Sequence, residues 1–296
     1  MKDAIIIGGG PAGVSAALYT ARAGLTTAII HKGGGALEKA ERVDNFYGSY
    51  GITGPALLEA GLAQAAAVGA EIIEGEAVKI QRRPQDGHFI VETTEASYCA
   101  VTLLLATGTS RLTPAIPGLA AYEGKGVSHC AVCDAFFYRG KDVAVLGTGP
   151  YALSEANELL PHVKSLIFLT NGEAPAQLPP DAAVRTEKIR EIQGDTRLTG
   201  ISFEPDGEIL PLHGIFIAMG TAGATDLARK AGAFTENNTV LADGSMQTAV
   251  PGLWAAGDCT PGMKQIAKAV YEGALAGTDM VRYVREGAGA PDPKEA

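Results

Sequence analysis

Short apolar runs alternate along the chain with glycine-rich turns and with longer stretches of small, mostly apolar residues. Residues 4–7 predict a buried strand, residues 8–13 a glycine-rich turn, and residues 14–23 a helix that begins directly after that turn. Residues 26–30 predict the next strand and complete a strand-helix-strand unit. A later apolar strand, residues 101–105, ends in another turn of small residues. This order of elements predicts an α/β fold with parallel strands.

The first glycine-rich turn has the composition of a dinucleotide-binding turn. Gly8 permits a tight turn, Gly10 lets the backbone approach a diphosphate, and Gly13 lets the helix pack closely against the strand. Pro11 suits the first turn of a helix, whose N-terminus stabilises an anion. Because a strand precedes this turn and a helix follows it, the segment predicts a dinucleotide-binding domain.

The same pattern occurs a second time in the middle of the chain. The apolar strand of residues 143–146 leads into Gly147 and Gly149, and Ala152 stands at the position of the third glycine. Near the end of the chain, residues 252–258 predict a short strand and a turn that ends in a carboxylate, placed to bind sugar hydroxyls. The chain therefore contains two dinucleotide-type folds.

The composition is that of a globular protein long enough for two domains: 296 residues, of which 46% are hydrophobic and 19% charged. A net charge of −9 and a pI near 5.1 argue against a nucleic-acid-binding surface, which requires a basic face. No apolar run approaches the ~18 residues of a membrane span, and the first strand is entered without the zones of a signal peptide. We therefore expect a cytoplasmic protein that binds neither membranes nor nucleic acid.

Cys130 and Cys133 form a CxxC pair that Asp134 follows directly. Such a loop holds two sulfurs close enough to form and break a disulfide, and an adjacent carboxylate is placed to carry protons. A zinc site would need further ligands, whereas Cys99 and Cys259 stand alone, so we expect no metal. A stabilising disulfide gains little from so short a loop. Two inert, buried thiols remain an alternative, and the redox interpretation is favoured.

Several motifs, in this order, resemble those of the low-molecular-weight thioredoxin reductase family over essentially the whole chain. They are residues 8–13, 43–48, 106–108, 126–134, 136–138 and 255–258. The resemblance implies two Rossmann-like dinucleotide-binding domains, the second inserted into the first, and a homodimer. The FAD-binding domain would comprise residues 1–112 and 246–296, and the inserted NAD(P)-binding-like domain, residues 113–245, would carry the CxxC.

The resemblance also implies roles for individual residues. Cys133 would face the flavin, Cys130 would attack the disulfide of a thioredoxin-like protein, and Asp134 would move protons. The residues implied to bind FAD are Gly8, Gly10, Pro11, Ala12, Gly13, Asn45, Ala106, Thr107, Gly108, Gly257, Asp258, Gln265, Ile266 and Ala267. A dinucleotide at the second turn would contact Gly147, Gly149 and Ala152.

The inserted domain departs from the family pattern where the family binds NADPH. The family places an arginine pair for the 2′-phosphate just after the second strand of this domain, whereas residues 170–173 read Thr-Asn-Gly-Glu, and the next arginine is Arg185. The Pro150-Tyr151 pair and residues 219–223 depart as well. Without the guanidinium groups that bind a phosphate bidentately, NADPH is disfavoured. NADH stays an alternative, because Glu173 is able to accept ribose hydroxyls.

These departures predict that the chain resembles the pyridine-nucleotide-independent branch of the family, the ferredoxin-dependent flavin thioredoxin reductases and the diflavin-linked disulfide oxidoreductases. A ferredoxin-like carrier, or a second FAD at the Gly147 turn, would then supply electrons to the first FAD. Three alternatives stay open: an NAD(P)H-dependent thioredoxin reductase, a ferredoxin-NADP reductase type that works without cysteines, and a flavin-binding sensor without disulfide reductase turnover.

Overall fold

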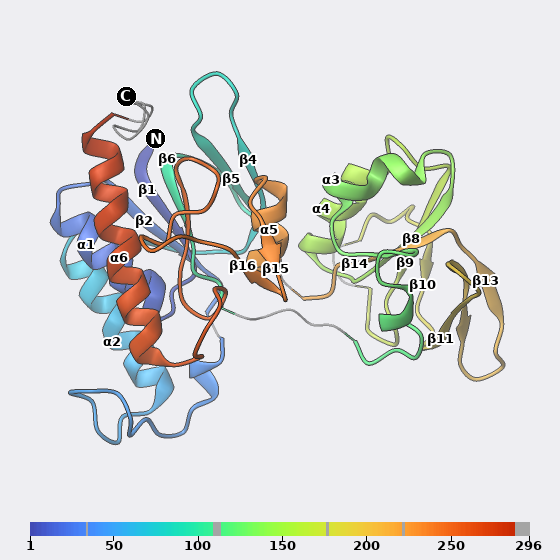
Figure 1. Ribbon diagram of the computed structural model, residues 1–296. Helices are drawn as coiled ribbons and strands as arrows, with labels where there is room; N and C mark the ends of the chain where they lie inside the picture. The colour runs from blue at the N-terminus through green and yellow to red at the C-terminus, as the bar shows by residue number, and fades with distance from the viewer. Residues whose placement is uncertain (34, 109–113, 176–177, 221–222, 288–296) are drawn as a thin grey trace. The chain divides into compact units, whose positions relative to one another are not determined.

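The computed structural model describes residues 1–33, 35–108, 114–175, 178–220 and 223–287. The chain divides into two compact units, one made of Met1–Ser110 and Gly223–Ala296 (unit 1) and the other of Arg111–Ala222 (unit 2). Unit 2 therefore interrupts unit 1 in the sequence, as the colour order of Figure 1 shows. The division groups residues 223–245 with unit 1, whereas the family resemblance implies a place for them in the inserted domain. The expected boundary at residue 112 lies outside the described residues.

Unit 1 is built on a seven-stranded sheet in the order β3-β2-β1-β6-β5-β4, with β17 beside β6. The parallel strands are β1 (Lys2–Ile7), β2 (Thr27–His31), β3 (Glu71–Glu74), β6 (Ser97–Leu105) and β17 (Leu253–Ala255), and the antiparallel extension is β5 (Phe89–Thr93) and β4 (Ala77–Arg82). β1 lies between β2 and β6, which explains why its isoleucines are fully buried and why an uninterrupted apolar run predicted it correctly.

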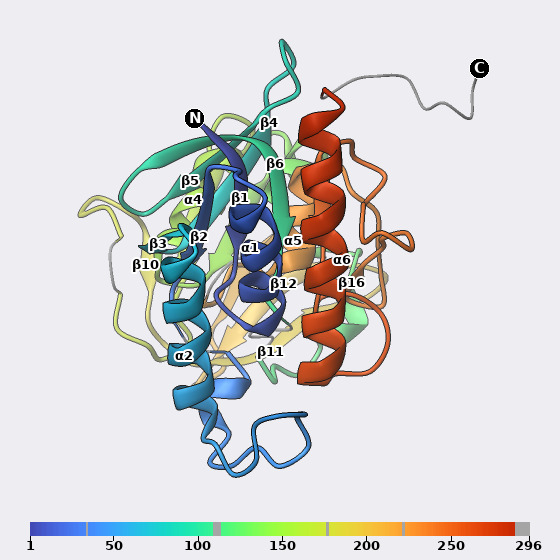
Figure 2. The same ribbon diagram turned by 90° about the vertical axis from the view of Figure 1, so that its left-hand side faces the viewer.

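Three helices lie side by side on one face of unit 1: α1 (Pro11–Arg22), α2 (Gly54–Ala67) and α6 (Ile266–Arg285) (Figure 2). Two glycines of α6 permit its close approach to α1. A Cβ atom built at Gly273 would lie 2.1 Å from the carbonyl oxygen of Ala12, and one built at Gly277 would lie 2.7 Å from that of Ala16. The last helix of the chain is thereby packed against the helix that follows the first glycine-rich turn.

Residues 223–245 belong to unit 1 because of their packing. They form α5 (Ala224–Lys230), β15 (Thr235–Glu236) and β16 (Thr239–Val240), and unit 1 also contains the short 3-10 helix η1 (Leu37–Lys39). α5 packs against β4 and β6, and the backbone nitrogen of Val240 donates a hydrogen bond of 2.8 Å to the carbonyl oxygen of Cys259. These contacts, which depend on tertiary structure, group the segment with unit 1.

Unit 2 contains a second parallel sheet, in the order β10-β9-β8-β14-β7, and a separate antiparallel sheet. The parallel strands are β7 (Val127–Ser128), β8 (Asp142–Leu146), β9 (Ser165–Leu169), β10 (Val184–Arg185) and β14 (Gly214–Ile217). The antiparallel strands are β11 (Ile189–Gly194), β12 (Leu198–Phe203) and β13 (Ile209–Pro211). The helical segments are η2 (Ala120–Tyr122), α3 (Ala131–Asp134), η3 (Ala135–Tyr138) and α4 (Pro150–Leu159).

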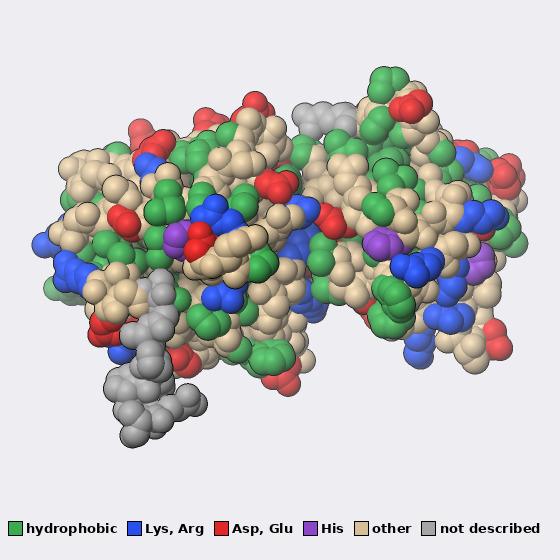
Figure 3. All heavy atoms as spheres, turned by 90° about the horizontal axis from the view of Figure 1, so that it is seen from above, with side chains coloured by type: hydrophobic (Ala, Val, Ile, Leu, Met, Phe, Trp, Pro, Cys, Tyr) green, Lys and Arg blue, Asp and Glu red, His purple; other side chains and the backbone are tan. Residues whose placement is uncertain are grey.

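On the face of the molecule drawn in Figure 3, acidic and basic side chains are interspersed among hydrophobic and neutral polar ones. Within the described ranges, no helix combines the length and the apolar character that crossing a membrane requires.

Candidate functional site

The two cysteines of the CxxC pair are joined by a disulfide, with their Cα atoms 5.3 Å apart. Cys130 has an extended backbone and caps the N-terminus of α3, where its Sγ accepts a hydrogen bond of 3.3 Å from the backbone nitrogen of Cys133. In the reduced protein this N–H group would stabilise a thiolate on Cys130. Cys130 is buried, with 3% of its surface exposed, whereas Cys133 is exposed. The two sulfurs therefore lie in different environments.

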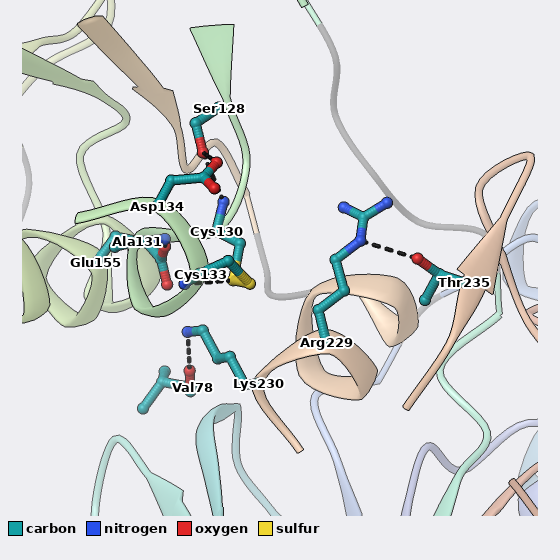
Figure 4. The surroundings of a disulfide bond; sticks show 10 residues. All are labelled: Val78, Ser128, Cys130, Ala131, Cys133, Asp134, Glu155, Arg229, Lys230 and Thr235. Atoms are coloured by element: carbon teal, nitrogen blue, oxygen red, sulfur yellow. Dashed lines mark hydrogen bonds between the residues drawn. A yellow bond between two sulfur atoms is a disulfide. The ribbon is translucent and has the colours of Figure 1, made fainter. Parts of the chain in front are cut away.

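The carboxylate of Asp134 lies beside the first cysteine because one hydroxyl holds it there. The Oγ atom of Ser128 donates to Asp134 Oδ2 at 2.7 Å and accepts from the backbone nitrogen of Cys130 at 3.2 Å (Figure 4). Ser128 is buried at the end of β7, the strand that leads into the CxxC segment. Sequence reasoning singled out Asp134 but missed Ser128, whose position two residues before Cys130 was the available signal.

A second carboxylate, which sequence reasoning also missed, contacts the CxxC helix from α4. The backbone nitrogen of Ala131 donates a hydrogen bond of 2.7 Å to Oε2 of Glu155 (Figure 4). Glu155 lies on the buried face of α4, with 1% of its surface exposed. The sequence signal for it was a lone acidic residue among the apolar positions of that face, and burial of such a residue requires a hydrogen-bond donor.

The first glycine-rich turn has the geometry that a bound diphosphate requires. Gly8 has a positive φ of 118°, and a Cβ atom there would lie 2.2 Å from the carbonyl oxygen of Ala106. A Cβ atom at Gly13 would lie 1.9 Å from the carbonyl oxygen of Gly8. At Gly10, in contrast, a Cβ atom would meet nothing within 4 Å. Two glycines therefore permit close backbone packing, while the third leaves open space for a ligand, so the turn fits a dinucleotide.

Other residues expected at the FAD site are brought to this turn within unit 1. A Cβ atom at Gly257 would lie 2.9 Å from the Cβ atom of Ala12, so the turn that contains Asp258 lies against the start of α1. The side-chain amide of Asn45 donates a hydrogen bond of 2.9 Å to Gln265, the residue that precedes α6. The segment with Gly257 thus lies against the first glycine-rich turn, and Asn45 contacts the residue that precedes α6.

The second glycine-rich turn repeats the geometry of the first. Gly147 has a positive φ of 151°, and a Cβ atom there would lie 2.2 Å from the carbonyl oxygen of Ala218 and 3.0 Å from Cβ of Ala152. At Gly149, as at Gly10, a Cβ atom would meet nothing within 4 Å. Both sites therefore keep the backbone geometry of a dinucleotide cradle, although the second turn has the buried, bulky Tyr151 at the position of Ala12.

The turn after β9, where the family binds the 2′-phosphate of NADPH, is held by polar contacts of its own. The hydroxyl of Thr170 donates to the carbonyl oxygen of Glu173 at 2.6 Å, and the side-chain oxygen of Asn171 accepts from the backbone nitrogen of Ile189 at 2.8 Å. The aliphatic part of the exposed Lys188 side chain lies against this turn, 3.0 Å from a Cβ atom built at Gly172.

Arg185 lies beside the end of β9, since it pairs in register with Leu169, but its guanidinium group is engaged elsewhere. Its Nη2 atom lies 2.8 Å from Glu208 and 2.8 Å from Glu187, and the group stacks over the ring of Phe203 at 4.7 Å. The hydrogen bonds that the guanidinium group donates to Glu208 and, to a smaller extent, to Glu187 raise the pKa of Arg185 above its ordinary value. Two carboxylates therefore neutralise the charge of the arginine that follows the turn in the sequence, so this charge is not available for a phosphate.

Comparison with known proteins assigns the chain to a family. Residues 2–273 match the family model "Pyridine nucleotide-disulphide oxidoreductase". The chain is 33% identical to the thioredoxin reductase of Listeria monocytogenes over 304 residues, which covers 96% of this chain and 94% of the relative. It is 34% identical to the thioredoxin reductase of Coxiella burnetii, with 95% of each chain covered.

Solved structures give the same assignment. The crystal structure of the atypical thioredoxin reductase of Desulfovibrio vulgaris Hildenborough has a TM-score of 0.90 and 39% identity, covering 98% of this chain and 100% of that one. The ferredoxin-flavin thioredoxin reductase of Clostridium acetobutylicum has a TM-score of 0.71 and 27% identity, covering 97% and 99%. The expected fold class, two Rossmann-like units with the second inserted into the first, is confirmed. The chain belongs to the thioredoxin reductase family of pyridine nucleotide-disulphide oxidoreductases, and it is a flavin-dependent oxidoreductase of that type.

Proposed function

We propose that this enzyme passes electrons from FAD through the Cys130–Cys133 disulfide to the disulfide of a thioredoxin-like protein, and that it takes its electrons from a donor other than NADPH. One observation carries the choice of donor: the guanidinium group of Arg185, beside the end of β9, is already engaged in ion pairs with Glu187 and Glu208. A phosphate at this turn would meet a neutralised arginine, so NADPH loses the contact that distinguishes it from NADH.

The first glycine-rich turn and its neighbours would hold FAD. The backbone at Gly10 borders the open space of the turn, and the N-terminus of α1 would stabilise the diphosphate. Asp258 would bind hydroxyl groups of the ribityl chain, and residues 265–267, at the start of α6, would border the isoalloxazine. Bound there, FAD supplies the two electrons that reduce a disulfide.

The dithiol half of the reaction rests on residues of unit 2. Cys130 would attack the partner disulfide, because the backbone N–H group of Cys133 favours its thiolate. Asp134, held by Ser128, would carry the proton that the exchange requires. The side chains of Phe136 and Phe137 follow the CxxC segment and are each 67% exposed, so they offer apolar contact area to a protein partner.

Two donors fit these observations. A ferredoxin-like carrier is the partner that the name of the Clostridium acetobutylicum neighbour suggests. A second dinucleotide flavin at the Gly147 turn is supported by the open space at Gly149, which matches that at Gly10. NADH remains the alternative, with Glu173 as the acceptor for ribose hydroxyls. We also expect the homodimer of the family, which sedimentation analysis of the purified protein tests.

Reduction of the purified protein without oxygen tests the proposal. Reduced ferredoxin is expected to bleach the flavin band quickly, whereas NADPH leaves it unchanged, and the reduced enzyme then reduces thioredoxin. Analysis of the ligands released on unfolding shows whether more than one flavin per chain is bound. Rapid bleaching of the flavin band by NADPH would overturn the proposal that the electron donor is not NADPH. In that case, the rate of bleaching in Lys188→Ala would show whether this lysine binds the 2′-phosphate. Failure of the chemically reduced enzyme to reduce any thioredoxin would overturn the dithiol half.

A further inference from the structure

Glu155 places a carboxylate inside unit 2, directly against the peptide that follows the first redox cysteine. Its Oε2 atom accepts the N–H group of Ala131 at 2.7 Å, and the side chain is almost completely buried (Figure 4). A hydrogen bond between a carboxylate and a backbone N–H group is among the stronger ones, and burial removes the water that would otherwise screen the charge. The contact therefore fixes both a geometry and a negative charge beside Cys130.

The negative charge of Glu155 affects the reduction of the Cys130–Cys133 disulfide. Reduction breaks the Sγ–Sγ bond, and two electrons from the reduced flavin together with one proton leave one thiolate and one thiol. The hydrogen bond from the backbone nitrogen of Cys133 favours the thiolate on Cys130. A neighbouring carboxylate opposes this new negative charge, and the repulsion is stronger in a buried site than in water. The disulfide itself carries no charge, so the repulsion acts on the reduced form alone.

We propose that Glu155 is a positioning residue that orients the Cys130–Ala131 peptide and keeps the dithiol a strong reductant by disfavouring its thiolate. A couple whose reduced form is stabilised is a good oxidant, so a couple whose reduced form is destabilised gives up its electrons more readily. This inference rests on the proposed function, in which Cys130 and Cys133 are the redox pair.

Glu155→Gln separates charge from geometry, because the amide oxygen still accepts the N–H group of Ala131. The holoenzyme is equilibrated without oxygen in buffers of reduced and oxidised dithiothreitol, and free thiols are counted by alkylation and mass spectrometry. E155Q is expected to raise the equilibrium constant for reduction about tenfold, which corresponds to about 30 mV for a two-electron couple. Glu158→Gln, on the same helix, is the matched control and is expected to leave the constant unchanged.

Glu155→Asp retains the charge and alters the geometry, so its equilibrium constant is expected to stay near that of the wild type. An unchanged constant in E155Q, or an equal shift in E155D, would overturn the proposal, and a lower melting temperature alone would show a merely structural role. If E155Q does not fold, the test rests on E155D. A tenfold rise in its equilibrium constant for reduction would show that the charge at this position does not set the constant, because E155D retains that charge. A wild-type disulfide that dithiothreitol does not reduce would instead contradict the proposed function.

Discussion

The Oγ atom of Ser128 donates a hydrogen bond of 2.7 Å to Oδ2 of Asp134, six residues further along the chain. The same oxygen accepts the N–H group of Cys130, so one buried hydroxyl joins the carboxylate to the backbone of the first redox cysteine. The carboxylate of Asp134, for which we propose a role in proton transfer, is therefore oriented by a neutral residue.

Ser128→Ala is expected to slow the reduction of a protein disulfide about tenfold, a part of the 10²–10⁴-fold contribution typical of a general acid or base. Asp134 would lose the hydrogen bond from Ser128 that orients its carboxylate, and we expect the pH dependence of the rate of disulfide reduction to change as a result. Steady-state rates across pH check this. Ser165→Ala removes a similar hydrogen bond, of 2.6 Å to Asp142, at another place in unit 2 and serves as the control. Equal rates in S128A and the wild type would remove Ser128 from the mechanism.

Cys130→Ser is expected to abolish the reduction of thioredoxin while reduction of the flavin continues, because only the protein-facing thiolate is lost. Cys133→Ser is expected to abolish turnover too, since the serine has no sulfur to form the disulfide. Cys99, a partly exposed residue of β6, offers a control, and Cys99→Ser should keep full turnover. Flavin absorbance and thioredoxin reduction, measured on the same samples, distinguish these outcomes.

Gly10→Val and Gly8→Ala are expected to fail in different ways. Gly10 has a negative φ of −77° and open space around it, so the valine variant folds but fills the position of the diphosphate and loses FAD. Gly8 has a positive φ and touches the backbone of Ala106, so even alanine destabilises the fold itself. Flavin content per folded protein and thermal unfolding measure the two effects. A Gly10→Val variant that purifies with bound FAD would contradict the assigned site.

The burial of Cys259 is expected to make the folded protein less stable at alkaline pH. Burial raises the pKa of its thiol to about 12, from an ordinary value of 9.0. The folded protein thus keeps a proton that the unfolded chain releases, and the stabilisation, complete below pH 9, declines as the pH rises toward 12. The expected slope is about 1.4 kcal/mol per pH unit. The free energy of unfolding in urea, measured between pH 7 and 11 for the wild type and for Cys259→Ala, checks this prediction, because the variant has no thiol to ionise. If the free energies of the two proteins depend on pH in the same way, Cys259 does not cause the loss of stability.

The geometry of the two glycine-rich turns was predictable because its requirements are local. The positive φ of Gly8 and of Gly147, and the close approach of each to a neighbouring strand, demand glycine whatever the rest of the chain does. The cysteine pair was predictable for the same reason, since its spacing alone brings the sulfurs together. Each of these features requires a particular residue type at a fixed spacing within a short segment, so the sequence of that segment is sufficient to identify it.

The partners of these features were not predictable, because they come from elsewhere in the fold. Glu155 reaches Ala131 only after α4 packs against α3, and 24 residues separate the two. Arg185 is able to bind a phosphate only if no carboxylate pairs with its guanidinium group. Glu208, which does pair with it, lies 23 residues further along the chain. Nothing in the local pattern around either residue indicates which side chain will meet it.

The close contact between α1 and α6 also determines when the protein can finish folding. Helix α6 occupies residues 266–285, and Gly273 and Gly277 seat it on a helix that the ribosome completed some two hundred and fifty residues earlier. All of unit 2 emerges before the last part of unit 1. A nascent chain therefore contains all of unit 2, with its disulfide, while unit 1 still lacks β17 and α6. Translation order therefore makes unit 2 available for folding before unit 1 is complete.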